Sequence, residues 1–257
     1  MRLSIAIPCF NEAPNVRALE ERLASVLPRL LADWSTLEIV LVDDGSRDDT
    51  AEAMRAFAAA ATRPGLDVVV RRHEQNAGLG AAIRTGLSTA TGDVVVTTDA
   101  DGTYRFSDIP ALLACLTPGV DLVTASPYHP QGAVENVPPH RLFLSRGASL
   151  LYRLLVRWRF YTWTALFRAY RRPVIETVPF ASDGFLAGTE ILVNAIAAGF
   201  VAAEFPAVLH ARTLGTSKAK LLRTIRAHLR FQGSLLLRRV TGHAPEGRPA
   251  GHAGSRV

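Results

Sequence analysis

The chain has 257 residues, of which 48% are hydrophobic and 20% are charged. This is the composition of an ordinary globular protein, and the length allows one large domain, or one domain with an appendage, around a substantial core. The formal net charge is +6, which suits anionic partners such as phosphates, nucleic acid or an acidic membrane surface without choosing among them.

An integral membrane protein is excluded, because the longest apolar stretch, Ile191 to Leu209, is interrupted by Asn194, Glu204 and Pro206. The two cysteines have no metal-ligand spacing. We therefore expect reduced thiols in a cytosolic protein. We also expect no signal peptide, since the first residues run directly into a predicted strand.

The first half of the chain alternates short apolar runs with helical patterns. The predicted strands are Leu3–Ile7, Leu37–Val42, Asp67–Arg71, Asp93–Thr98 and Asp121–Ala125. The predicted helices are Asn15–Leu31, Asp49–Ala61, Leu79–Ala90 and Ser107–Leu116. Such alternation is typical of right-handed βαβ units on a parallel sheet, so the predicted fold class is α/β with a mostly parallel sheet flanked by helices.

The regular alternation of predicted strands and helices ends after residue 125. A proline-rich loop is predicted over Ser126 to His140, and the further elements expected are helices over 142–157 and 187–198 and a strand over 200–208. Residues 218–240 form a basic amphipathic stretch, and residues 241–257 are expected to be disordered. We therefore predict one domain over 1–217, with a nucleotide-binding part over about 1–125 and an acceptor part over about 126–217.

Two carboxylates, Asp99 and Asp101, follow the predicted strand that ends at Thr98. Open α/β sheets bind their ligands at this edge. Oxygen ligands of this kind suit Mg²⁺ or Mn²⁺ held together with a substrate diphosphate. The alternative for the tripeptide alone is a solvated Asp-rich turn, because Asp-Gly is turn chemistry.

A second acidic cluster decides between these alternatives. Asp43 and Asp44 follow the strand that ends at Val42, and the first strand ends near Glu12. Three strand ends would then bring these acidic side chains, with Asp99 and Asp101, to one crevice. Packing does not require this arrangement and mutual repulsion opposes it, whereas a metal and a substrate rich in hydrogen-bond donors would relieve it.

Four segments in this order resemble the signature of the family 2 glycosyltransferases, which have the GT-A (Rossmann-like) fold. They are Pro8-Cys-Phe-Asn-Glu12, Val42-Asp-Asp-Gly-Ser-Arg-Asp-Asp-Thr50, Asn76-Ala-Gly-Leu-Gly80 and Asp99-Ala-Asp101. More closely, the chain resembles the dolichol-phosphate mannosyltransferases and their bacterial polyprenyl-phosphate relatives. The segments that point to this branch are Leu144-Ser-Arg-Gly-Ala-Ser149, Phe167-Arg-Ala-Tyr-Arg171, Gly188-Thr-Glu190 and Gly215-Thr-Ser-Lys218.

The resemblance implies a donor site for a nucleotide sugar. Asp99 and Asp101, with Thr103 as a further candidate, would hold Mg²⁺ or Mn²⁺, and Arg212 and Lys218 would clamp the donor phosphates. The full set of implied donor-binding residues is Pro8, Asn11, Glu12, Asp43, Asp44, Gly78, Asp99, Ala100, Asp101, Arg212 and Lys218. The implied catalytic residues are Asp101, Arg146, Arg212 and Lys218.

The resemblance also implies a lipid-phosphate acceptor, with GDP-mannose as the favoured donor and inversion at the anomeric carbon. A phosphate monoester is already anionic at neutral pH, so it needs positive charge and positioning rather than a general base. Arg146, and more weakly Arg141, resemble the residues that bind this phosphate. Two departures concern the acceptor: Pro127 replaces an arginine of the family, and Thr162 stands near an expected Asp.

Several alternatives stay open. A UDP-sugar donor, or a glycolipid or polysaccharide acceptor, would suit the same motifs, and a sugar-nucleotide nucleotidyltransferase shares the acidic pair. A module that binds nucleic acid through basic charge leaves the acidic crevice unexplained, so we expect no nucleic-acid partner. Glu190 either contacts a sugar or braces its own helix.

The basic helix at the end of the chain has two interpretations. It either lies on anionic lipid or packs on its own domain with a solvated basic face. We expect a cytoplasmic enzyme, with a peripheral contact to the inner face of the membrane or to a membrane-anchored partner.

Overall fold

The computed structural model describes residues 1–156, 158, 160–212 and 221–240. Within them a seven-stranded sheet has the order β3-β2-β1-β4-β7-β5-β8. Its strands are β1 (Arg2–Cys9), β2 (Thr36–Asp43), β3 (Leu66–Arg72), β4 (Val94–Thr97), β5 (Leu122–Ser126), β7 (Arg168–Arg171) and β8 (Ala202–Pro206). Neighbouring strands are parallel except where β7 pairs with β4 and β5. The predicted α/β class with a mostly parallel sheet is confirmed.

Both faces of the sheet are buried, which explains the continuous apolar runs of its strands. Successive side chains on a strand point to opposite faces. Ile5 therefore packs under the helices on one face, whereas Ala6 packs on the other. The first layer contains α1 (Ala13–Arg17), α2 (Leu19–Ala24), α3 (Leu27–Asp33), α4 (Thr50–Ala61) and α6 (Ile109–Ala114). The second contains α5 (Leu79–Thr89), α7 (Pro139–Leu155), α8 (Arg172–Thr177), α9 (Ala187–Ala197) and α10 (Leu221–Val240).

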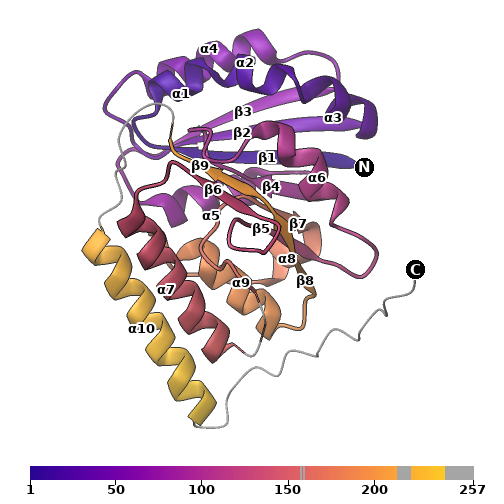
Figure 1. The fold of residues 1–257 in the computed structure, drawn as a ribbon. Coiled ribbons are helices and arrows are strands. Elements are labelled where there is room, and N and C mark those ends of the chain that lie inside the picture. The colour runs from indigo at the N-terminus through magenta and orange to yellow at the C-terminus, as the bar shows by residue number, and fades with distance from the viewer. Residues whose placement is uncertain (157, 159, 213–220, 241–257) are drawn as a thin grey trace.

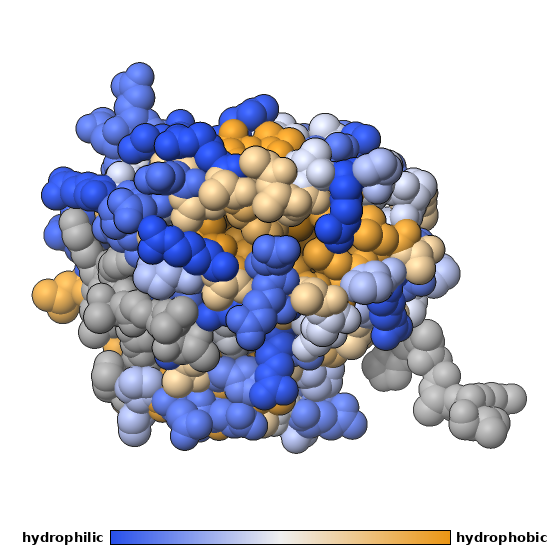
Figure 2. Space-filling model, turned by 90° about the horizontal axis from the view of Figure 1, so that it is seen from above, coloured by the Kyte–Doolittle hydropathy of each residue, from blue (hydrophilic) through white to orange (hydrophobic). Residues whose placement is uncertain are grey.

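The sheet therefore lies between two helical layers, with α1 to α4 above it and α5, α9 and the long helices α7 and α10 below it in Figure 1. Seen from above, the first layer has hydrophilic side chains around its edge and apolar ones toward its middle (Figure 2). One sheet includes strands from both sides of residue 125. The predicted division into a nucleotide-binding part and an acceptor part stays a prediction.

Several predicted elements are corrected by the structure. The single helix expected over 15–31 is three short helices, and α3 has Pro28 in its first turn. Proline has no N–H to donate to the preceding turn, so a continuous helix cannot pass through it. The helix expected over 107–116 is a 3₁₀ turn, Phe106–Asp108, followed by α6. The strand expected over 200–208 is two strands, β8 and β9 (Val208–His210).

Three elements were not expected. A short strand, β6 (Ala133–Glu135), lies inside the proline-rich loop and pairs in parallel with β9. The antiparallel strand β7 and the helix α8 follow one another in the middle of the chain. Strands of three or four residues give too little alternation to be recognised in a sequence.

Strand β7 carries Arg168, which is fully buried. Its guanidinium group donates to Thr124 Oγ1 at 3.0 Å, to the Trp163 carbonyl at 2.7 Å and to the Gly188 carbonyl. A buried cation is tolerated when its donors are used in this way. Arg168 thus joins β5, the loop before β7 and α9.

Helix α10 packs along α7, and the two long helices lie side by side in Figure 1. The Tyr152 hydroxyl lies 2.9 Å from His228 Nδ1, and Leu235 is buried in the same interface. Gly233 does not interrupt the helix. The expected helix is therefore present over 221–240, and its inner face is packed on its own domain. None of the helices in the described residues is long and apolar enough to span a membrane.

His228 makes the stability of this interface depend on pH. Burial lowers the pKa of His228 from 6.5 to about 4, so the folded state binds fewer protons than the unfolded state between these values. The contribution of His228 is complete above pH 6.5. It falls by about 3 kcal/mol as the pH drops toward 4. We expect the free energy of unfolding of His228→Gln to depend less on pH than that of the native chain, measured by urea denaturation from pH 7.5 to 4.5. Parallel pH profiles would contradict this assignment.

Candidate donor site at the carboxyl ends of the strands

The loops after β1 and β2 are joined by hydrogen bonds at the carboxyl edge of the sheet. The Asn11 N–H donates to Ser46 Oγ at 2.8 Å, and the Arg47 N–H donates to Asn11 Oδ1 at 2.8 Å. Asn11 has a φ of 51°, a left-handed conformation that asparagine tolerates better than most residues. The Glu12 N–H donates to Thr50 Oγ1 at 2.8 Å. The two strand ends thus form one continuous wall of polar groups.

Asp44 points into the protein and holds the loop before α5. Its carboxylate accepts hydrogen bonds from Asn76 Nδ2 at 2.8 Å and from the N–H groups of Ala77 and Gly78 at 2.9 and 2.8 Å. His73 Nδ1 lies 2.7 Å from the same group. The side chain is buried. These contacts give Asp44 a structural role, and its predicted contact with a nucleoside stays a prediction.

Asp43 is also fully buried, but one of its oxygens has no hydrogen-bond partner. Oδ1 accepts from the Ser46 N–H at 2.9 Å. Oδ2 lies 3.1 Å from Arg72 Nε in an ion pair, without the alignment of a hydrogen bond. An unsatisfied buried oxygen is costly unless a further donor reaches it.

Gly78 and Gly80 are required by close packing. Gly78 has a φ of 106°, and a Cβ atom there would collide with the carbonyl oxygen of Asp183. At Gly80 a Cβ atom would collide with the carbonyl of Ser182, and the Gly80 N–H donates to the Asp183 carbonyl at 2.7 Å. The loop is therefore clamped between Asp44 and residues 182–183. The predicted contact of Gly78 with a donor stays a prediction.

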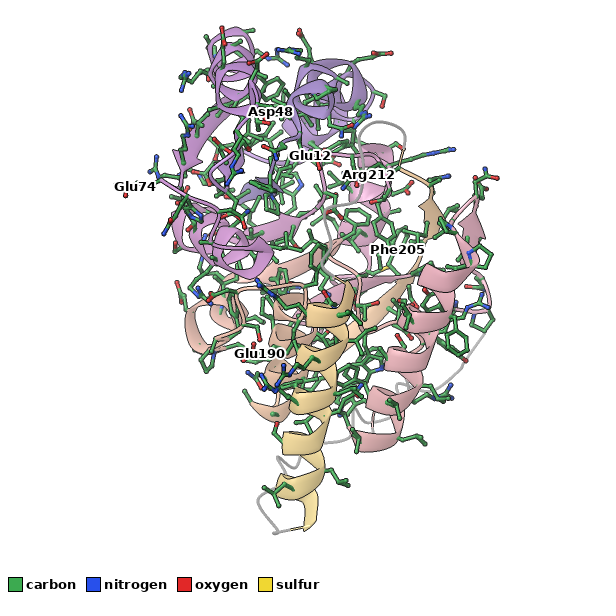
Figure 3. The ribbon with its side chains drawn as sticks, turned by 90° about the vertical axis from the view of Figure 1, so that its left-hand side faces the viewer. Glu12, Asp48, Glu74, Glu190, Phe205 and Arg212 are labelled. Carbon is green, nitrogen blue, oxygen red and sulfur yellow. The ribbon has the colours of Figure 1, made fainter. Side chains whose placement is uncertain are left out.

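Glu190 holds the segment around residues 181–182, against which the Gly80 loop packs. Its carboxylate accepts hydrogen bonds from the N–H groups of Ala181 at 3.1 Å and Ser182 at 2.9 Å. Of the two interpretations of Glu190, the structure supports bracing. In Figure 3, which faces the carboxyl edge of β1 and β2, Glu190 lies well below Glu12 and Arg212.

The loop with Asp99 and Asp101 follows β4. Asp101 is buried and its Oδ1 accepts from the Thr103 N–H at 3.0 Å. Arg22 of α2 donates to the carbonyl of Ala100 and, at 3.1 Å, to Asn15 Oδ1. Arg22 thus fixes the loop against the first layer of helices. The Thr103 carbonyl accepts from the His210 N–H at 2.9 Å, whereas the predicted role of its hydroxyl stays a prediction.

Arg212 joins the ends of β1 and β4. Its guanidinium group lies 2.8 Å from Glu12 Oε1 and 2.8 Å from Asp101 Oδ2. Glu12 also accepts from Asn15 Nδ2 at 2.6 Å. Figure 3 shows Glu12 and Arg212 next to each other at this edge, below Asp48. The structure therefore brings three of the predicted donor-site residues, Glu12, Asp101 and Arg212, into direct contact.

The electrostatics of the site are dominated by its acidic groups. Loss of surrounding water, and then the charge of Asp101, raise the pKa of Asp99 to about 8, although Arg212 acts in the opposite direction. Burial, followed by the nearby acidic groups, also raises the pKa of the Cys9 thiol, which therefore stays protonated. Burial is the largest cause of both shifts, and the neighbouring acidic groups add to it.

These residues fit a divalent cation. Among the described residues no group of three or more His, Cys, Asp or Glu side chains has the arrangement of a complete metal site. Mg²⁺ is commonly held by one or two carboxylates, with its remaining ligands from water and substrate phosphates. Asp99 and Asp101 would supply the two carboxylates of such a site, with the remaining ligands from water and a phosphorylated substrate.

On the acceptor side, Arg146 is exposed on α7 and its guanidinium carbon lies 5.1 Å from the centre of the Tyr128 ring. The two departures from the family pattern meet in space. The Thr162 hydroxyl accepts from Ser126 Oγ at 3.0 Å and from the Tyr128 N–H at 3.4 Å, on either side of Pro127. Lys218 lies outside the described residues, and the side chain of Arg141 is not described.

The model of the family described as Glycosyl transferase family 2 matches residues 4–178. The chain belongs to this family. Polyprenol monophosphomannose synthase of Mycolicibacterium smegmatis is 33% identical over 223 residues, which cover 84% of this chain and 80% of that protein. Dolichol-phosphate mannosyltransferase of Pyrococcus furiosus is 34% identical over 222 residues. That alignment covers 86% of this chain but only 60% of the relative.

A third relative of this glycosyltransferase is the undecaprenyl-phosphate 4-deoxy-4-formamido-L-arabinose transferase of Sodalis glossinidius. It is 31% identical, and the match covers 87% of this chain and 64% of the relative. Among solved structures, glucosyl-3-phosphoglycerate synthase from Mycobacterium tuberculosis with Mn²⁺, UDP and phosphoglyceric acid has a TM-score of 0.63 at 22% identity. That match covers 99% of this chain and 81% of the other, and it shows a shared fold.

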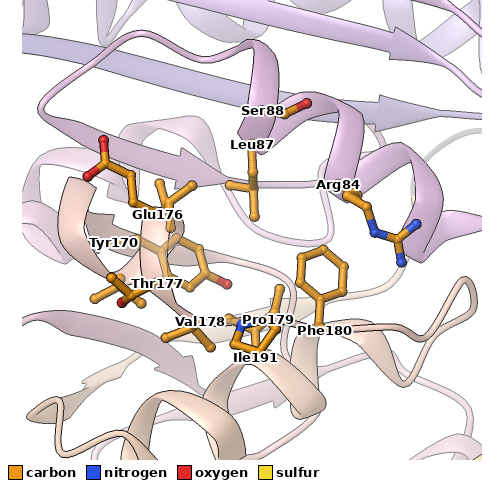
Figure 4. A pocket seen from close by; sticks show the side chains of 12 residues that line it. Arg84, Leu87, Ser88, Tyr170, Glu176, Thr177, Val178, Pro179, Phe180 and Ile191 are labelled. Carbon is orange, nitrogen blue, oxygen red and sulfur yellow. The ribbon is translucent and has the colours of Figure 1, made fainter.

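A cavity of about 310 Å³ lies elsewhere in the glycosyltransferase, between α5, α8 and α9. Figure 4 shows its mostly apolar lining, with Leu87, Phe180 and Ile191 facing one another and Arg84 at the rim. None of the predicted site residues lines it. The polar chemistry thus lies at the strand ends rather than in this cavity.

Several contributors to the site were not found from the sequence. Arg22, Asn15 and His73 lie within predicted helices or beside a predicted strand, and nothing in their local pattern distinguishes them from surface residues. Arg72 is likewise one of two adjacent arginines at the end of β3. Only the fold places these side chains against Ala100, Glu12, Asp44 and Asp43.

The close packing around Gly80 predicts that a methyl group added there lowers the stability of the protein, whereas one added at an exposed glycine does not. Gly80→Ala should lower the free energy of unfolding by about 1–3 kcal/mol, because the new methyl group has no room. Gly147→Ala is the matched control, since a Cβ atom there meets open space on α7 and alanine favours a helix. Denaturant unfolding of both variants checks this. Equal stability of the two variants would contradict a close-packed loop.

Proposed function

We propose that this glycosyltransferase transfers a sugar from a nucleotide sugar to a polyprenyl phosphate, with inversion at the anomeric carbon and with Mg²⁺ or Mn²⁺ at Asp99 and Asp101. The observation that carries the proposal is the contact of Arg212 with Glu12 and Asp101 at the end of the parallel sheet. This contact supports the proposal because arginine is a cation suited to phosphate, and it lies beside carboxylates suited to a metal ion.

The donor favoured is GDP-mannose, because two of the relatives are named for mannose transfer. A UDP sugar is the alternative, since the solved neighbours contain UDP. In either case the unsatisfied oxygen of Asp43 suits an N–H donor of a base. Glu12 and Asn11 would complete the nucleoside wall, with Pro8 beneath them.

The acceptor proposed is a phosphate monoester on a polyprenyl chain. Its oxygen is already ionised at neutral pH, so the enzyme needs no general base to activate it. Arg146, exposed in the middle of α7, is the cation proposed to position this phosphate, and Arg141 is a second candidate. A metal ion, when bound, would neutralise charge on the departing nucleoside diphosphate, and Arg212 would hold the same group together with Lys218.

A membrane contact is proposed for the outer faces of α7 and α10. Phe143 and Leu222 are 78% and 84% exposed, and other large apolar side chains on these helices are also exposed: Leu150, Leu151, Leu154, Leu229, Leu236 and Leu237. Arginines 223, 226 and 230 are exposed on α10. Apolar and basic side chains on one surface suit an anionic bilayer, where a polyprenyl phosphate resides.

The location proposed is the cytoplasmic side of the membrane. The free thiols of Cys9 and Cys115 accord with a reducing compartment. The membrane surface and the candidate donor site lie close together, because Figures 1 and 3 both place the first turn of α7 below the edge where β1 and β2 end.

In the central experiment, purified protein is incubated with labelled GDP-mannose, UDP-glucose or UDP-N-acetylglucosamine. Each donor is tested with Mn²⁺ or Mg²⁺, and with or without a polyprenyl phosphate. Label should enter the organic phase only when metal and lipid phosphate are both present. Asp101→Asn should lower turnover by about 100-fold or more, because the site loses a charge that holds the metal. Asp49→Asn, which alters an exposed ion pair with Arg17, should keep native activity.

Two results would contradict parts of this proposal. Native turnover of Asp101→Asn, with an unchanged melting temperature, would remove the metal role of this carboxylate. Metal-dependent hydrolysis of a donor without a lipid product would redirect the search to other acceptors, with Pro127 and Thr162 as the first positions to examine.

The membrane contact has its own test. A Leu229→Ser, Leu236→Ser double variant should lose sedimentation with phosphatidylglycerol vesicles but keep donor binding, because both side chains are exposed and leave the packed face of α10 intact. Phe185→Ser, an exposed apolar residue before α9, is the control. Unchanged sedimentation of the double variant, or a shift from dimer to monomer instead, would contradict a lipid partner.

A further inference from the structure

Arg212 forms ion pairs with both Asp101 and Glu12. Both distances are 2.8 Å, and the arginine side chain is only 22% exposed. An arginine guanidinium group keeps its proton in proteins. The guanidinium group therefore stays charged and neutralises part of an acidic cluster.

The contact of Arg212 with Asp101 uses a carboxylate oxygen that the proposed metal ion would also need. A divalent cation ligated by a carboxylate oxygen lies about 2.1 Å from it, whereas the guanidinium nitrogen of Arg212 already lies 2.8 Å from Asp101 Oδ2. Two cations on one oxygen repel each other strongly in a site that excludes water. Arg212 and a metal ion therefore compete for Asp101.

A diphosphate offers the guanidinium group a better partner. Arginine binds phosphate through two parallel charge-assisted hydrogen bonds, so a donor entering the site would attract Arg212 away from the carboxylates. The backbone just before Arg212 is anchored to two neighbouring loops. The preceding residues are fixed by the hydrogen bond of the His210 N–H to Thr103, at 2.9 Å, and of the Ala211 N–H to the Glu135 carbonyl, at 3.0 Å.

We propose that Arg212 is a counter-ion of Asp101 and Glu12 in the absence of ligands and is transferred from Asp101 to the donor diphosphate when metal and donor bind. This inference rests on the proposed function. The donor diphosphate draws Arg212 away from Asp101, which removes a positive charge beside the metal ion. Metal and donor therefore each bind more tightly when the other is present, in addition to the effect of their direct contact. Arg212 is then a positioning residue that couples metal binding to donor binding.

The inference is tested by calorimetric titration rather than by activity. The dissociation constant of Mn²⁺ is measured without nucleotide and then with saturating GDP or UDP, and the ratio of the two values is the coupling factor. Such factors are typically about 5–150. In Arg212→Ala we expect Mn²⁺ alone to bind more tightly, the nucleotide to bind more weakly, and the coupling factor to fall by about tenfold.

The coupling factor distinguishes the transfer of Arg212 to the diphosphate from simple repulsion between Arg212 and the metal ion. If Arg212 stayed on Asp101 throughout, its removal would still tighten metal binding, but it would leave the coupling factor unchanged, and that result would overturn the inference. Arg212→Lys keeps the charge but cannot span both carboxylates, so its coupling factor should fall between the other two. It also serves as the second variant if Arg212→Ala unfolds, which thermal melting reports.

The control variant is Arg17→Ala, which removes an exposed arginine paired with Asp49 and should keep the native coupling factor. Failure of the native protein to bind Mn²⁺ or either nucleotide would contradict the proposed function itself. Binding of both ligands with an unchanged factor in Arg212→Ala would contradict only the transfer of Arg212. The two failures are therefore separable.

Discussion

Acidic side chains meet at one edge of the sheet, and the structure around the site has to offset their mutual repulsion. Parallel strands end on the same edge, so Glu12, Asp43, Asp44, Asp99 and Asp101 are brought together by topology. Each is compensated differently. Asp44 is surrounded by N–H donors and His73, Asp43 is partly compensated by Ser46 and Arg72, and Arg212 is shared by Glu12 and Asp101.

The acidic groups differ in how their charges are offset, and this difference separates their roles. Asp44 is fully engaged in holding the loop of Gly78, and it supports the wall of the site without needing a ligand. Burial, followed by the charge of Asp101, raises the pKa of Asp99 to about 8. A cation from solution, together with a phosphorylated donor, would offset the charge of both carboxylates. The function proposed for this glycosyltransferase accords with that arrangement.

The sequence predicted the parallel core of the fold well, because strands β1, β2 and β4 are mostly apolar runs whose buried positions are visible in the residues themselves. It also predicted which strand ends carry the acidic groups. It did not predict β7, because its four residues, Arg-Ala-Tyr-Arg, include two arginines and form no apolar run. The three helices in place of one were also missed, although Pro28 gave a local signal.

The side-chain partners could be predicted less well than the elements. Asp43 and Asp44 are adjacent and chemically identical, and only the fold turns one toward the loop of Gly78 and the other toward Arg72. Glu190 could not be assigned because its partners are backbone N–H groups of a nearby loop. By contrast, Arg212 was identified from its motif, but its contact with residues about 200 positions earlier depends on the pairing of β9 with β6.

The most direct test of the account is a crystal structure of the protein grown with MnCl₂ and GDP, with data collected near the manganese absorption edge. The account predicts one anomalous peak within ligand distance of Asp99 or Asp101, in contact with the diphosphate, and the Arg212 guanidinium group on the phosphates. A manganese ion bound elsewhere, or a nucleotide in the cavity between α5 and α8, would contradict it.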